Sequence, residues 1–280
     1  MTRPLMRAAT AALRLVGRAP VRVGDDVMLL ADDVPEDVRQ AQLWQWLHGR
    51  HLNGLLAELG IDCVIDVGAN DGDFAAMVRG AGWTGPVASF EPQSGCVEAL
   101  KRLAADDPAW RIFGMALSDH DGLASLSLRS ASQLTSMNEP RLASRAASSE
   151  RVRDHLDVVG TEEIVVRRLD SIFDEVSATP VHRAYLKIDT QGHDELVLDG
   201  AGGVLDRVMA IQLELTRDPL YEGTSSYLSL IQRLERLGFG LSALFPVLVD
   251  PENHTLLEFD GVFVRSHRPE DPARGARHGA

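Results

Sequence analysis

The stretch CVIDVGANDGD, residues 63–73, decides the fold class of this chain. Its first five residues are apolar except for Asp66, which is typical of a strand buried on both faces. Gly68 permits a sharp turn and lets the backbone approach a ligand, while Gly72 lets the following helix pack close to the strand. Residues 64–79 are therefore predicted to form a strand, a turn and a helix that together hold a ligand.

Downstream of this stretch, strand-like and helix-like segments alternate. The strand-like segments are residues 87–92, 111–119, 184–192 and 209–215, and most are followed by a helical pattern. This alternation predicts an α/β fold with a Rossmann-like, mostly parallel sheet and helices on both faces. Two further strand-like runs, residues 240–250 and 255–265, flank a turn-rich Pro-Glu-Asn-His segment and predict a closing antiparallel hairpin.

The chain divides by pattern into three parts. Apolar residues at helical spacing over residues 34–60 predict a helical N-terminal extension or cap over residues 1–60. Residues 61–265 should form the main domain, in which residues 120–170 are less regular and are predicted to be an inserted lid, with a plain surface excursion as the alternative. Residues 266–280 have almost nothing to bury and should be a disordered tail.

Composition excludes several classes of protein. A net charge of −13 argues against nucleic-acid binding, which depends on Lys and Arg set against phosphates. No apolar run approaches the about 20 residues of a membrane-spanning helix. Two cysteines are too few for a disulfide framework, which favours the cytoplasm.

The first 23 residues carry five arginines and no acid. A frayed helix packed on the domain, peripheral membrane contact and a targeting signal remain open for them.

The loop after the first strand carries acids where a dinucleotide site would bind a diphosphate. The Gly68-Ala-Asn70-Asp-Gly72-Asp sequence departs from the G-x-G-x-x-G pattern of dinucleotide sites. Asp66 and the two acids that flank Gly72 would repel a diphosphate, but they suit a cationic sulfonium with an amino group. The charge of the loop therefore favours S-adenosyl-L-methionine over NAD.

A second carboxylate completes the expected cofactor site. Glu91 ends the next strand, 23 residues after Gly68, where its two oxygens could accept both ribose hydroxyls, and Pro92 stops the strand. Asp119 ends the third strand and could accept from the adenine amino group. A helix cap for Glu91 and an ordinary turn for Asp119 are the alternatives. The predicted cofactor-binding residues are Asp66, Gly68, Asn70, Gly72, Glu91, Pro92 and Asp119.

The segment LKIDTQGHD, residues 186–194, lies at the carboxyl end of a predicted central strand, where open α/β sheets place their ligands. We expect the acceptor site there. His193 is the best-suited base by its intrinsic pKa, with Asp189, Asp194 and Glu214 as alternatives that could orient it or the substrate. Asp189, His193 and Glu214 are the predicted catalytic residues. Asp189 and Glu214 could also hold Mg²⁺ through oxygen ligands, but no metal is included in the prediction.

Several motifs in order resemble the FkbM-type methyltransferases. They are VIDVGANDG, SFEP, ALSDHDG, RLDSIF, LKIDTQGHDELVLDGA, QLEL, DPLYEG and DGVFVR, and the match covers roughly residues 52–265. The resemblance implies a class I, S-adenosyl-L-methionine-dependent fold and O-methylation of a hydroxyl on a small molecule, sugar or glycolipid. Gly114 stands where the family usually has Asn, and Asp194 where it usually has Glu.

Two other functions keep the same fold. An NAD-dependent oxidoreductase would retain the sheet and Glu91, and a non-catalytic binding protein would retain the fold alone. The intact glycine turn and Glu91 argue against the second. Oligomeric state stays open, and a homo-oligomer is among the alternatives.

Overall fold

The computed structural model describes residues 18–23, 26–31, 35–138, 140–141, 155–250 and 253–266. The chain divides into two compact units, residues 1–51 and residues 52–280. In the first unit, β1 (Arg18–Val23) and β2 (Asp26–Ala31) pair antiparallel, and α2 (Glu36–Glu58) begins. The predicted helix is confirmed for α2 but wrong for residues 18–31. Their Val-rich runs on either side of Gly24-Asp25 are a hairpin pattern that the helical interpretation passed over.

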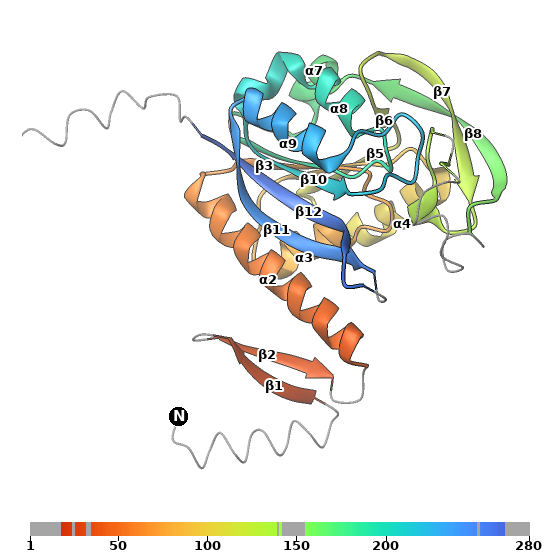
Figure 1. The fold of residues 1–280 in the computed structure, drawn as a ribbon. Coiled ribbons are helices and arrows are strands. Elements are labelled where there is room, and N and C mark those ends of the chain that lie inside the picture. Colours follow the sequence, from red (N-terminus) through yellow and green to blue (C-terminus); the bar gives the residue numbers. More distant parts are fainter. Residues whose placement is uncertain are drawn as a thin grey trace, which may run out of the picture. The chain divides into compact units, whose positions relative to one another are not determined.

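The second unit is built on a seven-stranded sheet with the order β11-β12-β10-β9-β3-β4-β5 (Figure 1). The strands are β3 (Cys63–Val67), β4 (Val87–Phe90), β5 (Trp110–Phe113), β9 (Ala184–Ile188), β10 (Val208–Thr216), β11 (Phe239–Val249) and β12 (Leu256–Arg265). β12 runs antiparallel to both of its neighbours, and the other adjacent pairs are parallel. The α/β class, the mostly parallel sheet and the closing hairpin are thus confirmed.

The path of the chain creates a crevice in the middle of this sheet. After β3 the chain adds β4 and β5 on one side, then returns to add β9 and β10 on the other. The loops that leave the carboxyl ends of β3 and β9 therefore begin side by side and then continue in opposite directions. Open α/β sheets bind their ligands at such a reversal of strand order.

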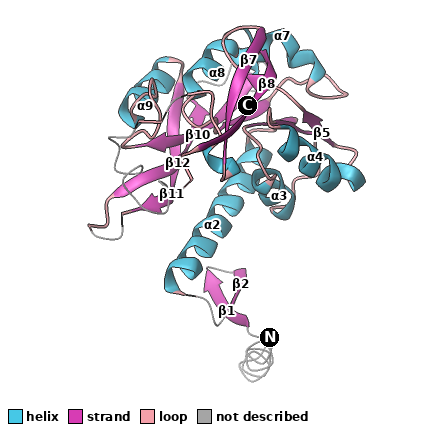
Figure 2. Cartoon of the chain, turned by 90° about the vertical axis from the view of Figure 1, so that its right-hand side faces the viewer, coloured by secondary structure: helices cyan, strands magenta, loops and turns pink. Residues whose placement is uncertain are grey.

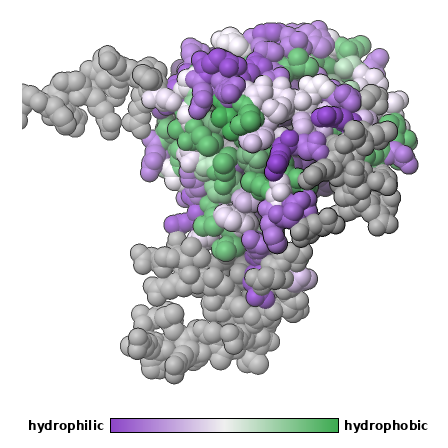
Figure 3. All heavy atoms as spheres, in the orientation of Figure 1, coloured by the Kyte–Doolittle hydropathy of each residue, from purple (hydrophilic) through white to green (hydrophobic). Residues whose placement is uncertain are grey.

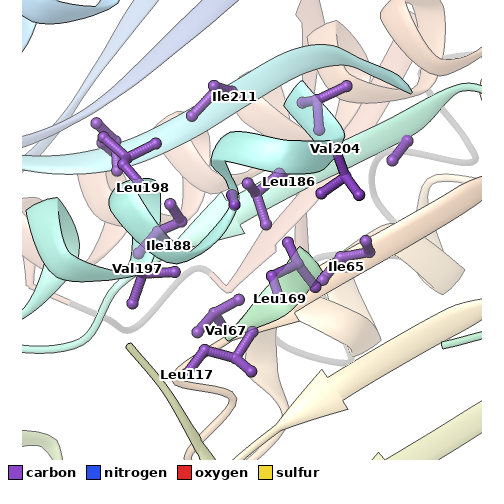
Figure 4. Packing of buried hydrophobic residues seen from close by; sticks show 14 of the residues in the cluster. Ile65, Val67, Leu117, Leu169, Leu186, Ile188, Val197, Leu198, Val204 and Ile211 are labelled. Carbon is purple, nitrogen blue, oxygen red and sulfur yellow. The ribbon is translucent and has the colours of Figure 1, made fainter. Parts of the chain in front are cut away.

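The two faces of the sheet differ in chemistry. One face is apolar, and Ile65, Val67, Leu186 and Ile188 pack there against α7 (Leu169–Ile172), α8 (Asp194–Gly200) and α9 (Tyr227–Arg236) (Figure 4). The helices α3 (Asp73–Gly80) and α4 (Ser94–Leu103) lie on the opposite side from α8 and α9 (Figure 2). Such helix layers on both faces are what nearly continuous apolar strands require.

The face toward α3 carries a row of buried polar residues at matching register. Ser89, Asp66, Lys187 and Gln212 sit side by side on β4, β3, β9 and β10, and each is less than a tenth exposed. Phe74 of α3 covers the row, with Lys187 Nζ 5.6 Å from the centre of its ring. Buried polar groups persist where they are paired with one another, so this row is a built network rather than a packing fault.

A second, three-stranded sheet stands beside the first. It has the order β6-β8-β7, from β6 (Ala116–Leu117), β7 (Gly122–Arg129) and β8 (Val158–Arg167). The single strand predicted over residues 111–119 is therefore split, because β5 joins the large sheet and β6 joins the small one. β7 and β8 lie inside the predicted lid, so much of residues 120–170 is sheet. Residues 142–154 of that prediction lie outside the described part of the chain.

The edge strand β11 has an apolar outer surface. Leu241, Leu244, Val247 and Val249 are each more than two-fifths exposed, and hydrophobic surface is visible around β11 and β12 in Figure 3. Across the described residues, the helices are all too short or too polar to cross a lipid bilayer. The predicted tail lies almost entirely beyond residue 266, outside the described ranges.

Candidate active site

The turn after β3 is shaped by three residues in the left-handed region. Gly68, Asn70 and Gly72 have φ angles of 75°, 45° and 90°. A Cβ atom on Gly68 would lie 1.8 Å from the carbonyl oxygen of Asp189, which is far inside contact distance. The turn after β3 and the turn after β9 are thus in direct backbone contact, and only glycine fits at that point.

Glu91 is fixed at the end of β4 by two backbone donors. Its Oε2 accepts from the Asn70 N–H at 2.9 Å and its Oε1 from the Gln93 N–H at 2.8 Å. The side chain is buried, and that burial raises the pKa of the carboxyl despite both hydrogen bonds. Each oxygen keeps a second lone pair, so the carboxylate can still accept from ligand hydroxyls. The glycine turn and Glu91, predicted from separate motifs, form one unit.

A pocket opens over these residues at the crevice between β3 and β9. Its volume is about 700 Å³ including the part open to solvent, within the range of small-molecule sites. Its lining includes Gly68, Asn70, Glu91, Pro92, Met115, Leu117, Asp189 and residues 132–133 and 135–137. We call it the cofactor pocket. Its polar end, formed by the glycine turn and Glu91, and its apolar end, around Met115 and Leu117, suit a nucleoside with a charged substituent.

Lys187 holds the floor of this pocket together. Its Nζ donates to the Gly68 carbonyl oxygen at 2.9 Å and lies 3.1 Å from Asp66 Oδ1 and 3.6 Å from Asp189 Oδ2. Burial alone would lower the pKa of Lys187, but Asp66 and Asp189 raise it above its ordinary value, so the amine is charged. The sequence prediction missed this residue. A lysine inside the otherwise apolar strand AYLKI was the available signal, because a lone buried amine requires carboxylate partners.

Two carboxylates meet beside Gln191. The Gln191 Nε2 lies 3.3 Å from Asp189 Oδ1 and 3.2 Å from Glu214 Oε2, so one amide bridges both. Burial raises the pKa of Glu214 well above its ordinary value, and repulsion from Asp189, Glu258 and Asp260 adds to the rise. The amide of Gln191 was not among the predicted residues.

A second, smaller pocket adjoins the first at Gln191, which lines both. It measures about 360 Å³ including open space, and its walls include Asp194, Glu214, Glu258, Tyr221 and Thr224. We call it the side pocket. Since it meets the cofactor pocket at the carboxylate pair, a molecule in the side pocket would present its atoms to whatever the cofactor pocket holds.

Residues 132–138, which we call the latch, close one wall of the cofactor pocket. Ser136 Oγ donates to the Gln191 carbonyl oxygen, and Asn138 Nδ2 donates to the Gly192 carbonyl oxygen, both at 2.9 Å. The latch is also tied to β7 through the bridge between Ser127 and Ser136. It thereby fixes the turn at Gln191 and Gly192, whose φ angles of 53° and 94° are left-handed.

The predicted site residues separate into those that line a pocket and those that do not. Gly68, Asn70, Glu91, Pro92 and Asp189 line the cofactor pocket, and Glu214 lines the side pocket.

Four predicted residues line neither pocket. Asp66 lies beneath the floor as the partner of Lys187, and a Cβ atom on Gly72 would meet Leu100 and Trp110. Asp119 is half-exposed and hydrogen-bonded to His120. His193 is buried, with its Nε2 2.8 Å from Ser118 Oγ.

No cluster of three or more His, Cys, Asp or Glu side chains suited to a metal ion occurs within the residues that the structure describes.

Comparison with known proteins gives one assignment by sequence. A family model described as "Methyltransferase FkbM domain" matches residues 66–241, which include the glycine turn, Glu91, Asp189 and Glu214. No curated protein matches the chain.

Solved structures with a similar fold include three methyltransferases. An rRNA methylase from Streptococcus thermophilus is 12% identical, with a TM-score of 0.41, over 78% of this chain and 95% of that one. The magnesium protoporphyrin IX methyltransferase from Synechocystis, with bound SAM, is 10% identical, with a TM-score of 0.43, over 84% and 86%. A Burkholderia thailandensis N1-methyltransferase acting on 1,6-didemethyltoxoflavin, with bound S-adenosylhomocysteine, is 13% identical, with a TM-score of 0.40, over 89% and 95%. Likeness at this level carries nothing about the acceptor.

Proposed function

The chain belongs to the FkbM methyltransferase family, and from that premise we propose that it transfers the methyl group of S-adenosyl-L-methionine to a hydroxyl oxygen of a small molecule, sugar or glycolipid. The observation that carries the proposal is the junction of two pockets at Gln191. One pocket suits the cofactor, and the other ends at the carboxylates that could take a hydroxyl proton.

The residues of the cofactor pocket fit S-adenosyl-L-methionine. Glu91 is held in place by Asn70 and Gln93 and has lone pairs left for ribose hydroxyls, and Met115 and Leu117 supply apolar walls for a base. Asp189 is a third exposed, which leaves its carboxylate available to a cationic ligand. The bound cofactor would supply an electrophilic methyl group on a sulfonium.

The carboxylate pair supplies the proton acceptor in this proposal. An alcohol is a weak nucleophile until it begins to lose its proton, and methyl transfer also requires alignment of the attacking oxygen. Asp189 lies at the pocket junction and Glu214 is linked to it through Gln191, so a hydroxyl that enters from the side pocket meets a carboxylate first. The assignment of His193 as the base stays a prediction. Its Nε2 is hydrogen-bonded to Ser118, and the residue lines neither pocket.

The oxidoreductase alternative loses its support with the family assignment. The turn after β3 lacks the G-x-G-x-x-G pattern of pyrophosphate-binding turns, and Glu91 serves either class. A non-catalytic protein of the same fold remains a distinct hypothesis, which the assay below separates from ours.

The test is methyl transfer over a panel of hydroxylated acceptors, read as S-adenosylhomocysteine formed and as a methyl ether in the product. Asp189→Asn should lower kcat by about 100-fold or more, since general base catalysis contributes on this order. Asp106→Asn, at an exposed position of the short helix Ala104–Asp106, is the matched control. Product methylated on nitrogen or carbon, or full activity of Asp189→Asn, would refute this assignment. Calorimetric binding of NAD without binding of S-adenosyl-L-methionine would refute the cofactor as well.

A further inference from the structure

Arg129, at the end of β7, is a buried cation with an unused edge. The residue is only 4% exposed. Its Nη1 donates to the carbonyl oxygen of Leu156, whereas its Nε and Nη2 have no hydrogen-bond partner. Most buried polar groups are satisfied, so a buried guanidinium with two unpaired nitrogens requires an explanation.

The geometry of the unused donors is specific. Nε and Nη2 form one side of the planar guanidinium, and their N–H groups point in the same direction. That side matches the two oxygens of a carboxylate or phosphate, which it binds through two parallel hydrogen bonds. Arg79 shows the contrast within this chain, because its Nε is paired with Asp107 at 2.7 Å, leaving one nitrogen unpaired. Burial of an uncompensated charge is costly, and a bound anion removes that cost.

Arg129 lies next to Tyr221, which is a wall residue of the side pocket. Burial raises the pKa of the Tyr221 hydroxyl. The Arg129 guanidinium is close enough to that hydroxyl to oppose the rise, through its charge and a hydrogen bond. Tyr221 lines the side pocket together with Gln191 and Glu214. The backbone N–H of Arg129 also donates to Thr135 Oγ1, which places the strand end against the latch. The arginine thus contacts one wall residue of the side pocket and one residue of the latch.

We propose that the Nε and Nη2 edge of Arg129 binds an anionic group of the acceptor, a carboxylate or a phosphate, and so selects acidic or phosphorylated hydroxyl compounds. The inference rests on the proposed function only for the identity of the acceptor, since the anion site itself follows from the burial and the unpaired donors. Burial raises the pKa values of Glu214 and Glu258 on the wall of the side pocket.

The site can be tested on the full-length protein without cofactor or turnover. Inorganic phosphate and acetate, as separate titrants, should shift the Arg129 Nε–H resonance in an arginine-edited ¹⁵N spectrum in a saturable way. The two probes distinguish a preference for phosphate from one for carboxylate. In a calorimetric titration, Arg129→Lys, which keeps the charge but loses the fork, should bind the preferred anion about tenfold or more weakly than the wild type. Arg102→Gln, exposed on α4, is the matched control. Absence of any shift of the wild-type resonance would overturn the proposal.

A second measurement separates anion binding from a structural role. In anion-free buffer, Arg129→Gln should melt at the same temperature as the wild type or higher, because it removes an uncompensated buried charge. The wild type alone should then gain thermal stability as phosphate or acetate is added. A marked loss of melting temperature in Arg129→Gln, without any response of the wild type to anions, would mean that Arg129 only supports Leu156. Failure of methyl transfer in the acceptor panel would leave these binding results unaffected, so the two proposals fail separately.

Discussion

Gly68 is the residue at which the chain passes closest to another part of the site. Two constraints require glycine at this position. Its φ angle is left-handed, and an added Cβ atom would lie 1.8 Å from the Asp189 carbonyl oxygen. Gly68→Ala should lower the free energy of unfolding by about 3 kcal/mol or more, since both backbone strain and overpacking contribute. Urea denaturation measures this change.

Gly95 gives the matched comparison for that variant. It lies in the first turn of α4, and nothing stands within 4 Å of a Cβ atom added there. Gly95→Ala should be neutral or stabilising by up to about 1 kcal/mol. Equal effects of the two alanines would show that the contact between the turns after β3 and β9 is not constrained as described.

Glu91 combines a structural and a binding role in one carboxylate. Glu91→Gln keeps the shape but replaces one acceptor oxygen with an amide donor, which cannot accept from the Asn70 or Gln93 N–H. We expect the Kd for S-adenosyl-L-methionine to rise by about tenfold or more, since hydrogen bonds to a charged acceptor are lost. Calorimetry measures it, with Glu98→Gln on the exposed side of α4 as control. An unchanged Kd in Glu91→Gln would remove Glu91 from the cofactor site.

Among the secondary-structure elements, the small sheet β6-β8-β7 acts on the pocket through the latch. β7 carries the latch at its end, and two latch side chains bind carbonyl oxygens of the turn after β9. The double variant Ser136→Ala with Asn138→Ala removes both of these hydrogen bonds. At about 1 kcal/mol each, their loss should raise the Kd for S-adenosyl-L-methionine by about 5- to 30-fold.

The expected rise in the Kd for S-adenosyl-L-methionine follows from the strained turn that the latch holds in place. Gln191 and Gly192 have left-handed φ angles, and without the latch that turn has fewer restraints on the pocket wall. Ser125→Ala, at an exposed position of β7, should leave the Kd unchanged. A double variant that binds as tightly as the wild type would show that the latch does not support the cofactor pocket.

At the scale of the whole molecule, several acids around the junction have pKa values raised by burial. The pKa is about 6 for Asp194 and about 7 for Asp260, in each case chiefly through desolvation. The folded state therefore binds protons that the unfolded chain releases, and the associated stability is complete below about pH 4 and lost as the pH rises toward 7. We expect the free energy of unfolding to be lower at pH 7.5 than at pH 5 by about 1 to 3 kcal/mol.

Repulsion within a chain of net charge −13 acts in the same direction, so a matched pair of variants is needed. Asp260→Asn and Asp174→Asn each remove one charge, but the Asp174 side chain is 90% exposed. Denaturation at both pH values should show a smaller pH dependence for Asp260→Asn alone. Equal slopes for the two variants would assign the effect to net charge rather than to the buried cluster.

Local patterns were sufficient for much of the sheet and for part of the site. The glycine turn and Glu91 were predicted because a strand end, a left-handed turn and a strand-end acid are each encoded within a few residues. Lys187 is marked locally by its apolar strand, but the roles of Lys187, Gln191 and the latch depend on partners 119, 23 and 55 residues away, which no local pattern identifies. His193 and Asp119 have suitable chemistry in sequence, but tertiary packing directs them toward Ser118 and His120.

The sequence by itself determined the α/β class, the position of the glycine turn and membership of the FkbM family, since apolar periodicity and short motifs act over neighbouring residues. The tertiary structure decided which polar groups meet. Register between β3, β9 and β10 brings Asp66, Lys187 and Gln212 into one row, and the parallel pairing of β3 with β9 brings Gly68 against Asp189. Both follow from strand pairing between distant segments, and the free energy of that pairing depends on the whole sheet rather than on any one stretch of chain.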